Sequence, residues 1–292
     1  MQVQIVNAFV DHGKGGNPAG VVLDADMLSD IEKLEIAAMV GLSETAFISK
    51  SETAEFKLDF FTPSRQIAHC GHATIAAFSY LNQLGRLRSS SSSKETIDGN
   101  REIKLQGSLA FMEQQRPQYS SVVESEALIL ESLGIQRSDL IPNAPILKVN
   151  TGNSFVIVPL KDVEILKNVA PNSELISQVS DTLDLIGFYI FTLENAVADS
   201  DVNARMFAPR YGIEEESGTG MAAGPLAAYL YDRLGIRKSK FKIGQGTYMP
   251  EPSPSLICVE LEIVDGEIVS LMAGGKGVLK KQLHVEIDSS KS

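Results

Sequence analysis

Two glycine-containing turns in the sequence combine residue types that can bind an anion and move a proton. The first turn holds Cys70, Gly71 and His72, and the second is Glu216-Ser217-Gly218-Thr219-Gly220. Glycine lets backbone N–H groups approach a ligand without a Cβ in the way. A helix that begins at such a turn adds unpaired N–H donors and a positive partial charge, which favour a carboxylate or a developing oxyanion. Helix capping would explain either turn alone, but two such turns in one chain favour a binding function.

The two turns belong to an internal repeat whose members lie roughly half the chain apart. The paired segments are Gly16-Asn17-Pro18-Ala19-Gly20-Val21-Val22 with Gly152-Asn153-Ser154-Phe155-Val156-Ile157-Val158, Phe61-Thr62-Pro63-Ser64-Arg65 with Phe207-Ala208-Pro209-Arg210, and Cys70-Gly71-His72-Ala73 with Ser217-Gly218-Thr219-Gly220. This repeat predicts two related lobes that share one site. Such an arrangement is typical of an enzyme more often than of a scaffold.

Glu44 is the first candidate for proton transfer. It follows a predicted helix end at Gly41 and precedes the apolar run Ala46-Phe47-Ile48. A carboxylate that is partly removed from water at the start of a core strand can act as a general acid and base. An ordinary surface glutamate would have the same sequence context. His72 could share a proton with Glu44 or bind the substrate, and a packing histidine is the alternative.

Cys70 and Ser217 occupy equivalent places in the repeat. Paired thiols across a cleft serve cofactor-independent racemases, in which one thiol removes an α-proton and the other returns it. Here the second position is a hydroxyl, which is not appreciably ionised near neutral pH, so a two-thiol mechanism is disfavoured. Glu216 is a second candidate carboxylate, with a solvated run of acidic residues at 214–216 as the alternative.

Composition narrows the class of protein. The chain has 292 residues, 43% of them hydrophobic, which is enough to bury a substantial core. Its net charge of −11 argues against a nucleic acid partner and disfavours an anionic membrane surface. Two cysteines imply no disulfide framework, and with an N-terminus unlike a signal peptide they favour the cytoplasm. No apolar run reaches the roughly 18 residues of a membrane span, and without a CxxC or HExxH motif no metal site is predicted.

The pattern of apolar residues predicts an α+β protein in which strands outnumber helices. Each half holds one strongly apolar helix, one beginning near Gly71 and the other spanning 218–234, and such a helix is expected to be enclosed by a sheet. A third helix is predicted from its N-cap Ser29 to Val40, with Lys33 in place of the capping-box glutamate.

The lobe boundaries are predicted from polar and low-complexity stretches. Five serines at 89–93 indicate a turn or short insertion, and the polar, proline-containing stretch 114–121 is predicted to link the lobes. We therefore expect an N-terminal lobe over residues 1–116, which a final strand at 278–287 could complete. The C-terminal lobe would cover residues 117–277.

A hairpin is predicted near the C-terminus. Asp265-Gly266 favours a type I′ turn between strands at 256–264 and 267–273. Cys258 lies in the first of these strands and is expected to be buried. A catalytic Cys70 would then react with iodoacetamide much faster than Cys258.

Several motifs spread over most of the chain are together far more specific than any one glycine turn. They are Asn7-Ala8-Phe9, Gly16-Asn17-Pro18-Ala19-Gly20-Val21, Ser43-Glu44-Thr45-Ala46-Phe47, Phe61-Thr62-Pro63 leading into Cys70-Gly71-His72-Ala73-Thr74, and Arg205-Met206-Phe207-Ala208-Pro209 leading into Ser217-Gly218-Thr219-Gly220. With these motifs the chain resembles the PhzF-like phenazine biosynthesis family, within the diaminopimelate epimerase-like superfamily.

The resemblance implies two pseudo-symmetric lobes of the diaminopimelate epimerase-like fold, each a curled, mostly antiparallel sheet or half-barrel around a central helix. It also implies a homodimer, no cofactor, and a site in the cleft. Glu44 matches the family's acid/base glutamate, which shuttles a proton while a carbon–carbon double bond moves, and His72 matches its active-site histidine. The family's second motif usually reads Asp-Pro-Ala-Thr-Gly-Ser, whereas here Glu216 replaces the aspartate and Met221 the last serine. Both changes alter polar groups that are expected to touch the substrate.

The leading hypothesis is a cofactor-independent isomerase that acts on a small carboxylic acid. Glu44 would move a proton between two carbons, while His72 and Glu216 orient the substrate. The predicted substrate-binding residues, whose turns would hold the carboxylate, are Asn17, Cys70, Gly71, Ala73, Ser217, Gly218, Thr219 and Gly220. Two alternatives stay open: Cys70 as the single base of a racemase, epimerase or dehydratase of an amino or hydroxy acid, or a non-catalytic protein that binds a small molecule.

Overall fold

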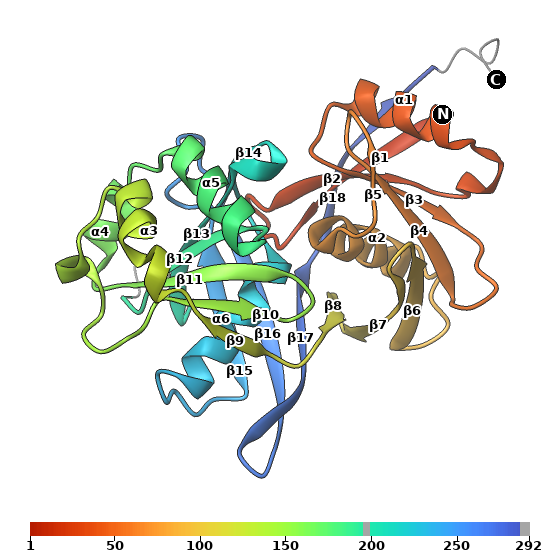
Figure 1. Ribbon diagram of the computed structural model, residues 1–292. Helices are drawn as coiled ribbons and strands as arrows, with labels where there is room; N and C mark the ends of the chain where they lie inside the picture. The colour runs from red at the N-terminus through yellow and green to blue at the C-terminus, as the bar shows by residue number, and fades with distance from the viewer. Residues whose placement is uncertain (195–198, 287–292) are drawn as a thin grey trace. The chain divides into compact units, whose positions relative to one another are not determined.

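The computed structural model describes residues 1–194 and 199–286 (Figure 1). It divides into two compact units, one formed by Met1–Glu113 with Gly274–Ser292 and the other by Gln114–Ala273. The last strand, β18 (Val278–His284), belongs to the first unit. Residue 287, with which the predicted final strand ended, lies outside the described residues.

The first unit is a curled sheet with one helix inside it and one outside. Its strands follow the order β18-β1-β2-β3-β4-β6-β7-β8, in which β2–β3 and β4–β6 are parallel and the other neighbours antiparallel. In chain order the elements are β1 (Gln2–Ala8), β2 (Asn17–Val22), η1 (Ala25–Met27), α1 (Asp30–Val40), β3 (Thr45–Ser49), β4 (Phe56–Phe61), β5 (Gln66–Ile67), α2 (Gly71–Gln83), β6 (Ser91–Thr96), β7 (Gly99–Gln106) and β8 (Leu109–Gln114), followed by β18.

The second unit has the same plan. Its strands follow the order β9-β10-β11-β12-β13-β15-β16-β17, in which β11–β12 and β13–β15 are the parallel pairs. The elements are β9 (Gln118–Ser121), η2 (Val123–Ser125), α3 (Glu126–Leu133), η3 (Arg137–Asp139), β10 (Leu147–Asn150), β11 (Ser154–Leu160), α4 (Val163–Asn168), α5 (Ser173–Leu183), β12 (Gly187–Thr192), β13 (Val202–Ala208), η4 (Pro209–Tyr211), β14 (Ile213–Glu216), α6 (Gly220–Asp232), β15 (Lys240–Gln245), β16 (Ser255–Val264) and β17 (Glu267–Lys276).

The two units match strand for strand. β1 to β8 of the first unit correspond to β10 to β17 of the second, with the parallel pairs at equivalent places. In each unit a short strand, β5 or β14, comes just before the central helix, α2 or α6. The sequence repeat is therefore a repeat of fold, and the predicted α+β class with two pseudo-symmetric lobes is confirmed.

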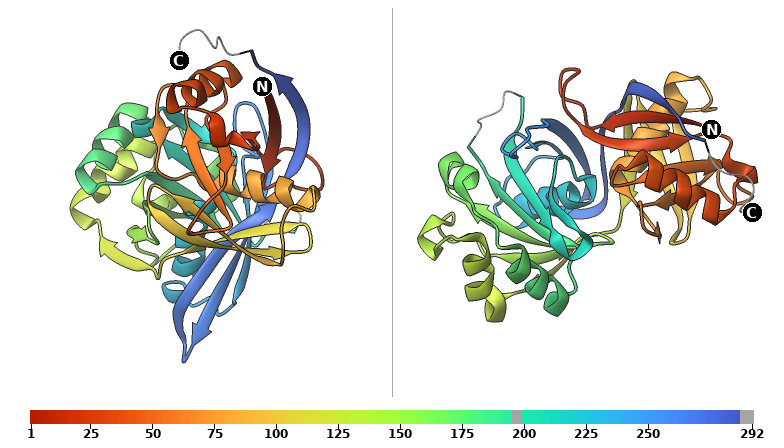
Figure 2. Two further views of the ribbon diagram at one scale, coloured as in Figure 1. Left: turned by 90° about the vertical axis from the view of Figure 1, so that its right-hand side faces the viewer. Right: turned by 90° about the horizontal axis from the view of Figure 1, so that it is seen from above.

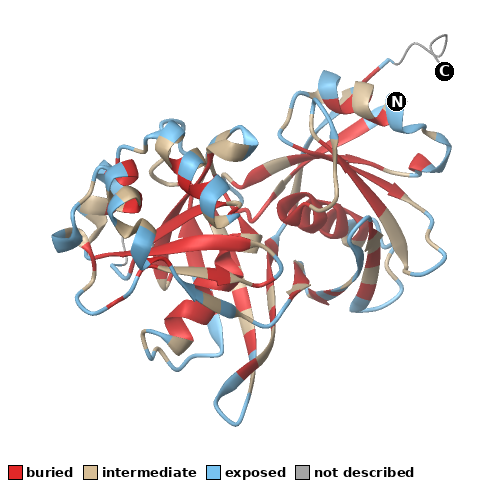
Figure 3. Ribbon diagram, in the orientation of Figure 1, coloured by how far each residue is buried: buried red, intermediate tan, exposed pale blue. Residues whose placement is uncertain are grey.

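Both central helices are buried, as their composition predicts. Every residue of α2 from Gly71 to Leu81 is buried, and so is every residue of α6 from Ala222 to Tyr231 (Figure 3). Small side chains let the sheet close tightly around the helix. A Cβ on Gly224 would lie only 2.0 Å from Gln114 Oε1, for example. A buried helix of this kind can hold its N-terminus at a fixed place on the sheet.

The other helices cover the outer faces of the sheets. In the first unit Ile36 and Ala37 of α1 pack in an apolar cluster with Val3 and Ile5 of β1. In the second unit α3 and α5 pack on alternate residues of β11, so the intervening residues of that strand face α6. Each sheet is thus a layer between a central helix and an outer one. No helix among the described residues has the length and apolar character needed to cross a membrane.

The helix α1 begins and ends where the sequence predicts, with Ser29 as N-cap and Gly41 as C-cap. The capping box, however, uses Glu32, whose carboxylate accepts the backbone N–H of Ser29 at 2.8 Å. The assignment of Lys33 to that place was wrong by one residue. Lys33 is buried and its amine donates to Asp59 at 2.6 Å, which joins α1 to β4.

The structure corrects the predictions for the serine run and for Cys258 and confirms the predicted hairpin. The serine run is not a loop: residues 91–93 begin β6, which pairs with β7 because alternating side chains there point into the unit. Cys258 is only half-buried, since it lies on the less covered face of β16. The hairpin of β16 and β17 is confirmed, with Asp265 and Gly266 at φ of 52° and 84° in its turn (Figure 2).

Candidate active site

Glu44 is held at the start of β3 by a close approach of β2. The backbone N–H of Gly20 donates to the Glu44 carbonyl at 3.0 Å, and β2 runs parallel to β3 with Gly20 opposite Thr45. A Cβ on residue 20 would lie 2.6 Å from Thr45 Oγ1, so only glycine permits this pairing. In this position Glu44 is buried, with 8% of the residue exposed.

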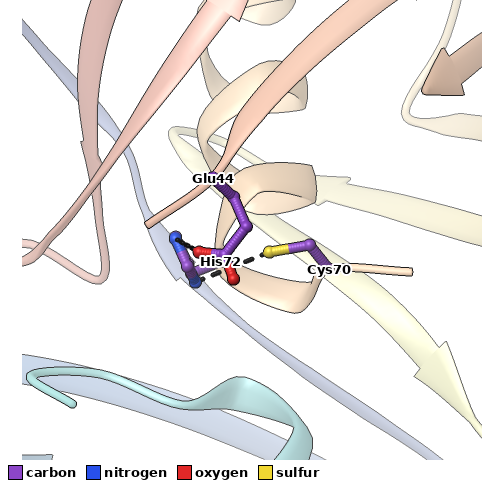
Figure 4. A group of neighbouring side chains, drawn as sticks. All are labelled: Glu44, Cys70 and His72. Carbon is purple, nitrogen blue, oxygen red and sulfur yellow. Dashed lines mark hydrogen bonds and ion pairs between the residues drawn. The ribbon is translucent and has the colours of Figure 1, made fainter. Parts of the chain in front are cut away.

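Three side chains of the first unit meet at the N-terminus of α2 (Figure 4). His72 lies between the other two: its Nε2 is 3.3 Å from Glu44 Oε2, and its Nδ1 is 3.6 Å from Cys70 Sγ. All three residues are buried. Glu44 Oε2 makes no hydrogen bond within the part of the chain that the structure describes, so its contact with His72 is its only polar one there. The predicted neighbourhood of Glu44 and His72 is present in the structure.

Cys70 is the N-cap residue of α2, but its side chain makes no capping hydrogen bond. Its carbonyl accepts the Thr74 hydroxyl at 2.6 Å. Burial raises the pKa of the Cys70 thiol, an effect that the adjacent His72 partly offsets. Since the thiolate is the reactive form of cysteine, a raised pKa makes Cys70 a poor base near neutral pH. Glu44 is the better candidate.

We predict that Cys258 reacts with iodoacetamide before Cys70 in the folded protein. Cys258 is half-buried and Cys70 is buried, and burial raises the pKa of both thiols. Accessibility therefore decides the order. Mass spectrometry of peptides after timed alkylation measures it, with alkylation in denaturant as the control. Faster labelling of Cys70 would indicate an activated thiol and favour the cysteine mechanism.

A buried lysine donates a hydrogen bond to a side chain in the first turn of α2. Lys94 of β6 is fully buried, and its amine donates to Thr74 Oγ1 at 2.7 Å and lies 3.1 Å from His69 Nδ1. Its Nζ also lies 4.9 Å from the centre of the Phe60 ring. Because the Thr74 hydroxyl donates to the Cys70 carbonyl, Lys94 is linked to Cys70 through one side chain. No sequence pattern indicates this role, since Lys94 directly follows a run of serines.

In the second unit the equivalent turn is organised by Gln245. Its amide nitrogen donates to the Glu216 carbonyl at 2.7 Å and to Thr219 Oγ1 at 3.0 Å. Its amide oxygen accepts the Tyr189 hydroxyl at 2.8 Å and the Thr219 backbone N–H at 3.1 Å. Gln245 is 1% exposed, and burial, with a smaller effect of Glu216, raises the pKa of Tyr189 well above its usual range. Gln245 lies in no recognisable sequence motif and was not predicted.

The acidic run 214–216 is solvated only in part: Glu214 is exposed, Glu215 and Glu216 are half-buried, and each carboxylate has a partner of its own. Glu214 accepts the hydroxyl of Ser173, and Glu215 forms a two-bond ion pair with Arg205, both at 2.9 Å. Glu216 accepts the hydroxyl of Thr219. Alternation along β14 sends Glu215 and Glu216 to opposite sides of the strand. Glu216 thus faces the start of α6.

The remaining predicted substrate-binding residues are distributed over both units. In the first unit Gly71 and Ala73 lie in the first turn of α2, and Asn17 is a buried residue at the start of β2. In the second, Ser217 and Gly218 are buried between β14 and α6, Thr219 is the N-cap of α6, and Gly220 is its first residue. Glu44, Cys70 and His72 meet in one unit, and Glu216 and Thr219 meet in the other. Their roles stay predictions.

Comparison with known proteins defines the class. A sequence profile described as phenazine biosynthesis-like protein matches residues 6–282. An uncharacterized isomerase of Clostridium acetobutylicum is 34% identical over 291 residues, which cover 94% of each chain. The crystal structure of a PhzF-family phenazine biosynthesis protein from Bacillus anthracis superposes with a TM-score of 0.89, at 28% identity, over 98% of this chain and 99% of that one.

One relative has a named reaction. The trans-2,3-dihydro-3-hydroxyanthranilate isomerase of Pseudomonas fluorescens is 29% identical over 287 residues, covering 94% of this chain and 95% of its own. The fold is that of the diaminopimelate epimerase-like superfamily, and the protein is an isomerase. The chain belongs to the phenazine biosynthesis-like, or PhzF, family.

Proposed function

We propose that the protein is a cofactor-independent isomerase in which Glu44 carries a proton between two carbons of a small carboxylic acid. One observation supports this most directly: Glu44 Oε2 is buried, makes no hydrogen bond among the described residues, and lies 3.3 Å from His72 Nε2. A carboxylate oxygen placed in this way is available to a substrate C–H group. His72 is the neighbour that orients it.

The proposed step conserves atoms and charge. Glu44 removes a proton from one carbon, the electron pair moves through the adjacent double bond, and Glu44 returns a proton to a second carbon. The proton on the Glu44 carboxyl exchanges with solvent before it is returned, so deuterium from D2O enters the product. The intermediate resembles an enolate, whose charge develops on the substrate carboxylate. Backbone N–H groups at the start of α2, where the Cys70 side chain forms no cap, are suited to that charge. No oxidant or reductant takes part.

The substrate of the proposed isomerase can be identified by deuterium uptake from D2O. A panel of carboxylic acids would include a dihydro-hydroxyanthranilate, suggested by the Pseudomonas fluorescens relative. Diaminopimelate and hydroxyproline would represent amino acid epimerisation. Uptake into one compound by mass spectrometry or NMR identifies the substrate class. Thermal stabilisation by a panel compound without any uptake would overturn the isomerase proposal in favour of a binding protein.

We predict that Gln245→Leu lowers the exchange rate by up to about a hundredfold, because misplacement of binding groups by about 1 Å has effects of this size. The substitution keeps the side-chain size and removes the three hydrogen bonds from Gln245 to the 216–219 segment, together with the one to Tyr189. Gln178→Leu, on an exposed position of α5, is the matched control. Unchanged exchange in a folded Gln245→Leu protein would remove the 216–219 segment from the site.

A further inference from the structure

The three side chains at the N-terminus of α2 are also a set of metal ligands. Glu44, Cys70 and His72 each offer one ligand atom, and these atoms lie within 4.8 Å of one another. All three residues are buried and come from one unit, from the residue before β3 and the first turn of α2 (Figure 4). The sequence shows no metal motif because Glu44 is far from the other two along the chain.

The donor types fit a tetrahedral cation, and so does one of the two short separations at a time, because each involves a different ring nitrogen of His72. Thiolate sulfur, imidazole nitrogen and carboxylate oxygen are the ligands of Zn²⁺, at about 2.3, 2.0–2.1 and 2.0–2.2 Å. At tetrahedral angles these bond lengths put neighbouring ligand atoms about 3.3–3.6 Å apart. The distances here are 3.6 Å from Cys70 Sγ to His72 Nδ1 and 3.3 Å from Glu44 Oε2 to His72 Nε2. A cation takes one of the two ring nitrogens, and the third ligand must close in by about 1 Å.

A buried carboxylate oxygen without a hydrogen bond is a second observation, independent of the distances, that points to a cation at this site. Glu44 Oε2 is buried without a hydrogen bond among the described residues, so a carboxylate oxygen is already out of water and can move towards a cation without breaking a hydrogen bond. A buried anionic oxygen is stabilised strongly by a metal ion. Three protein ligands leave a fourth position for water or for a substrate carboxylate, as in zinc sites that are open to exchange.

We propose that Glu44, Cys70 and His72 bind one Zn²⁺ ion, and that the bound ion inhibits the isomerase. Binding forms a sulfur–zinc bond and releases the Cys70 thiol proton to solvent, with no change of oxidation state. His72 contributes a nitrogen lone pair and Glu44 one carboxylate oxygen. Proton transfer stops because Glu44 is then occupied. Only the inhibition rests on the proposed function, since binding depends on the ligands alone. A thiolate in the set favours Zn²⁺ over Mg²⁺.

Cobalt spectroscopy tests the binding without any activity measurement. Co²⁺ is titrated into the full-length protein after chelator treatment, and a thiolate-to-cobalt charge-transfer band with strong visible bands of tetrahedral cobalt is expected. Added Zn²⁺ should displace the cobalt and remove these bands. Cys70→Ser should abolish the charge-transfer band. Glu44→Gln and His72→Asn should each weaken Zn²⁺ binding by more than the roughly 10–100-fold that loss of an outer partner causes.

Cys258→Ser is the matched control and should leave the spectrum unchanged, because Cys258 lies in the other unit. A charge-transfer band that survives Cys70→Ser, or no band at all in the folded wild type, would overturn the metal site. Circular dichroism of each variant verifies that it folds. Zinc that binds at this site without slowing deuterium exchange would overturn the inhibition. Exchange measured in chelator, without metal, tests the proposed function separately.

Discussion

Glu44→Gln should lower the rate of solvent deuterium exchange into the substrate by about 10²–10⁴-fold, the range that a positioned general acid–base contributes. Glutamine keeps the shape of the side chain and the contact with His72, but its amide cannot accept and return a proton. The substitution also replaces an acceptor oxygen that lacks a hydrogen bond in the described structure, so we expect little loss of stability. The measurement is deuterium incorporation by NMR, at equal protein concentration.

Cys70→Ser is the variant that distinguishes the two mechanisms. A hydroxyl in place of the buried thiol leaves Glu44 and His72 in place, so the exchange rate should fall far less than in Glu44→Gln. Exchange that persists in Glu44→Gln and vanishes in Cys70→Ser would contradict the glutamate mechanism. It would instead make Cys70 the base, despite the burial that raises the pKa of its thiol.

The sequence offered a contact of Glu44 with His72 as one possibility, and the family resemblance placed both residues in the active site, while the local motifs predicted where each residue lies. Glu44 follows a helix end and opens a core strand, and His72 follows a glycine that opens a buried helix. The internal repeat predicted two lobes of similar fold, because equivalent sequence segments form equivalent strands and the two central helices. In each case a short stretch of sequence determines its own local structure.

Lys94 and Gln245 could not be predicted in the same way. Both are strand residues whose partners come from elsewhere in their own unit, through the parallel pairs β4–β6 and β13–β15. Pairing between strands that are distant in sequence cannot be predicted from the residues that neighbour Lys94 or Gln245 along the chain. Lys94 was hidden further by the serine run, whose composition resembles a loop although its side chains alternate as in a strand.

The burial of Lys94 has a consequence for stability. Its amine is fully buried, and among the described residues no carboxylate lies within ion-pair distance. Burial lowers the pKa of Lys94 to about 7; Arg101 also lowers it, whereas Cys70 and Asp98 act in the opposite direction. The neighbouring His69 has a pKa lowered well below its usual range, chiefly by burial, and is neutral over this pH range. Lys94 is therefore the group whose charge changes on folding.

The direction in which the free energy of unfolding changes with pH follows from the number of protons bound in each state. Between pH 7 and about 10.4, the ordinary pKa of lysine, the unfolded chain holds a proton on Lys94 that the folded protein has lost. The unfolded state binds more protons, so the free energy of unfolding rises with pH. One proton contributes a slope of up to about 1.4 kcal/mol per pH unit. Below pH 7 both states hold the proton, and this contribution to the slope disappears.

Lys94→Met should remove that slope. Methionine has a similar length and no charge, so the difference in unfolding free energy between variant and wild type should fall by up to about 1.4 kcal/mol for each unit of rising pH. Urea denaturation at pH 7, 8 and 9 measures it, and taking the difference cancels titrations that both proteins share. Lys281→Met, on an exposed position of β18, should leave the slope unchanged. Parallel curves for wild type and Lys94→Met would mean that Lys94 stays charged in the fold. Thr74, His69 and the Phe60 ring would then be sufficient to hold an ammonium ion next to the first turn of α2.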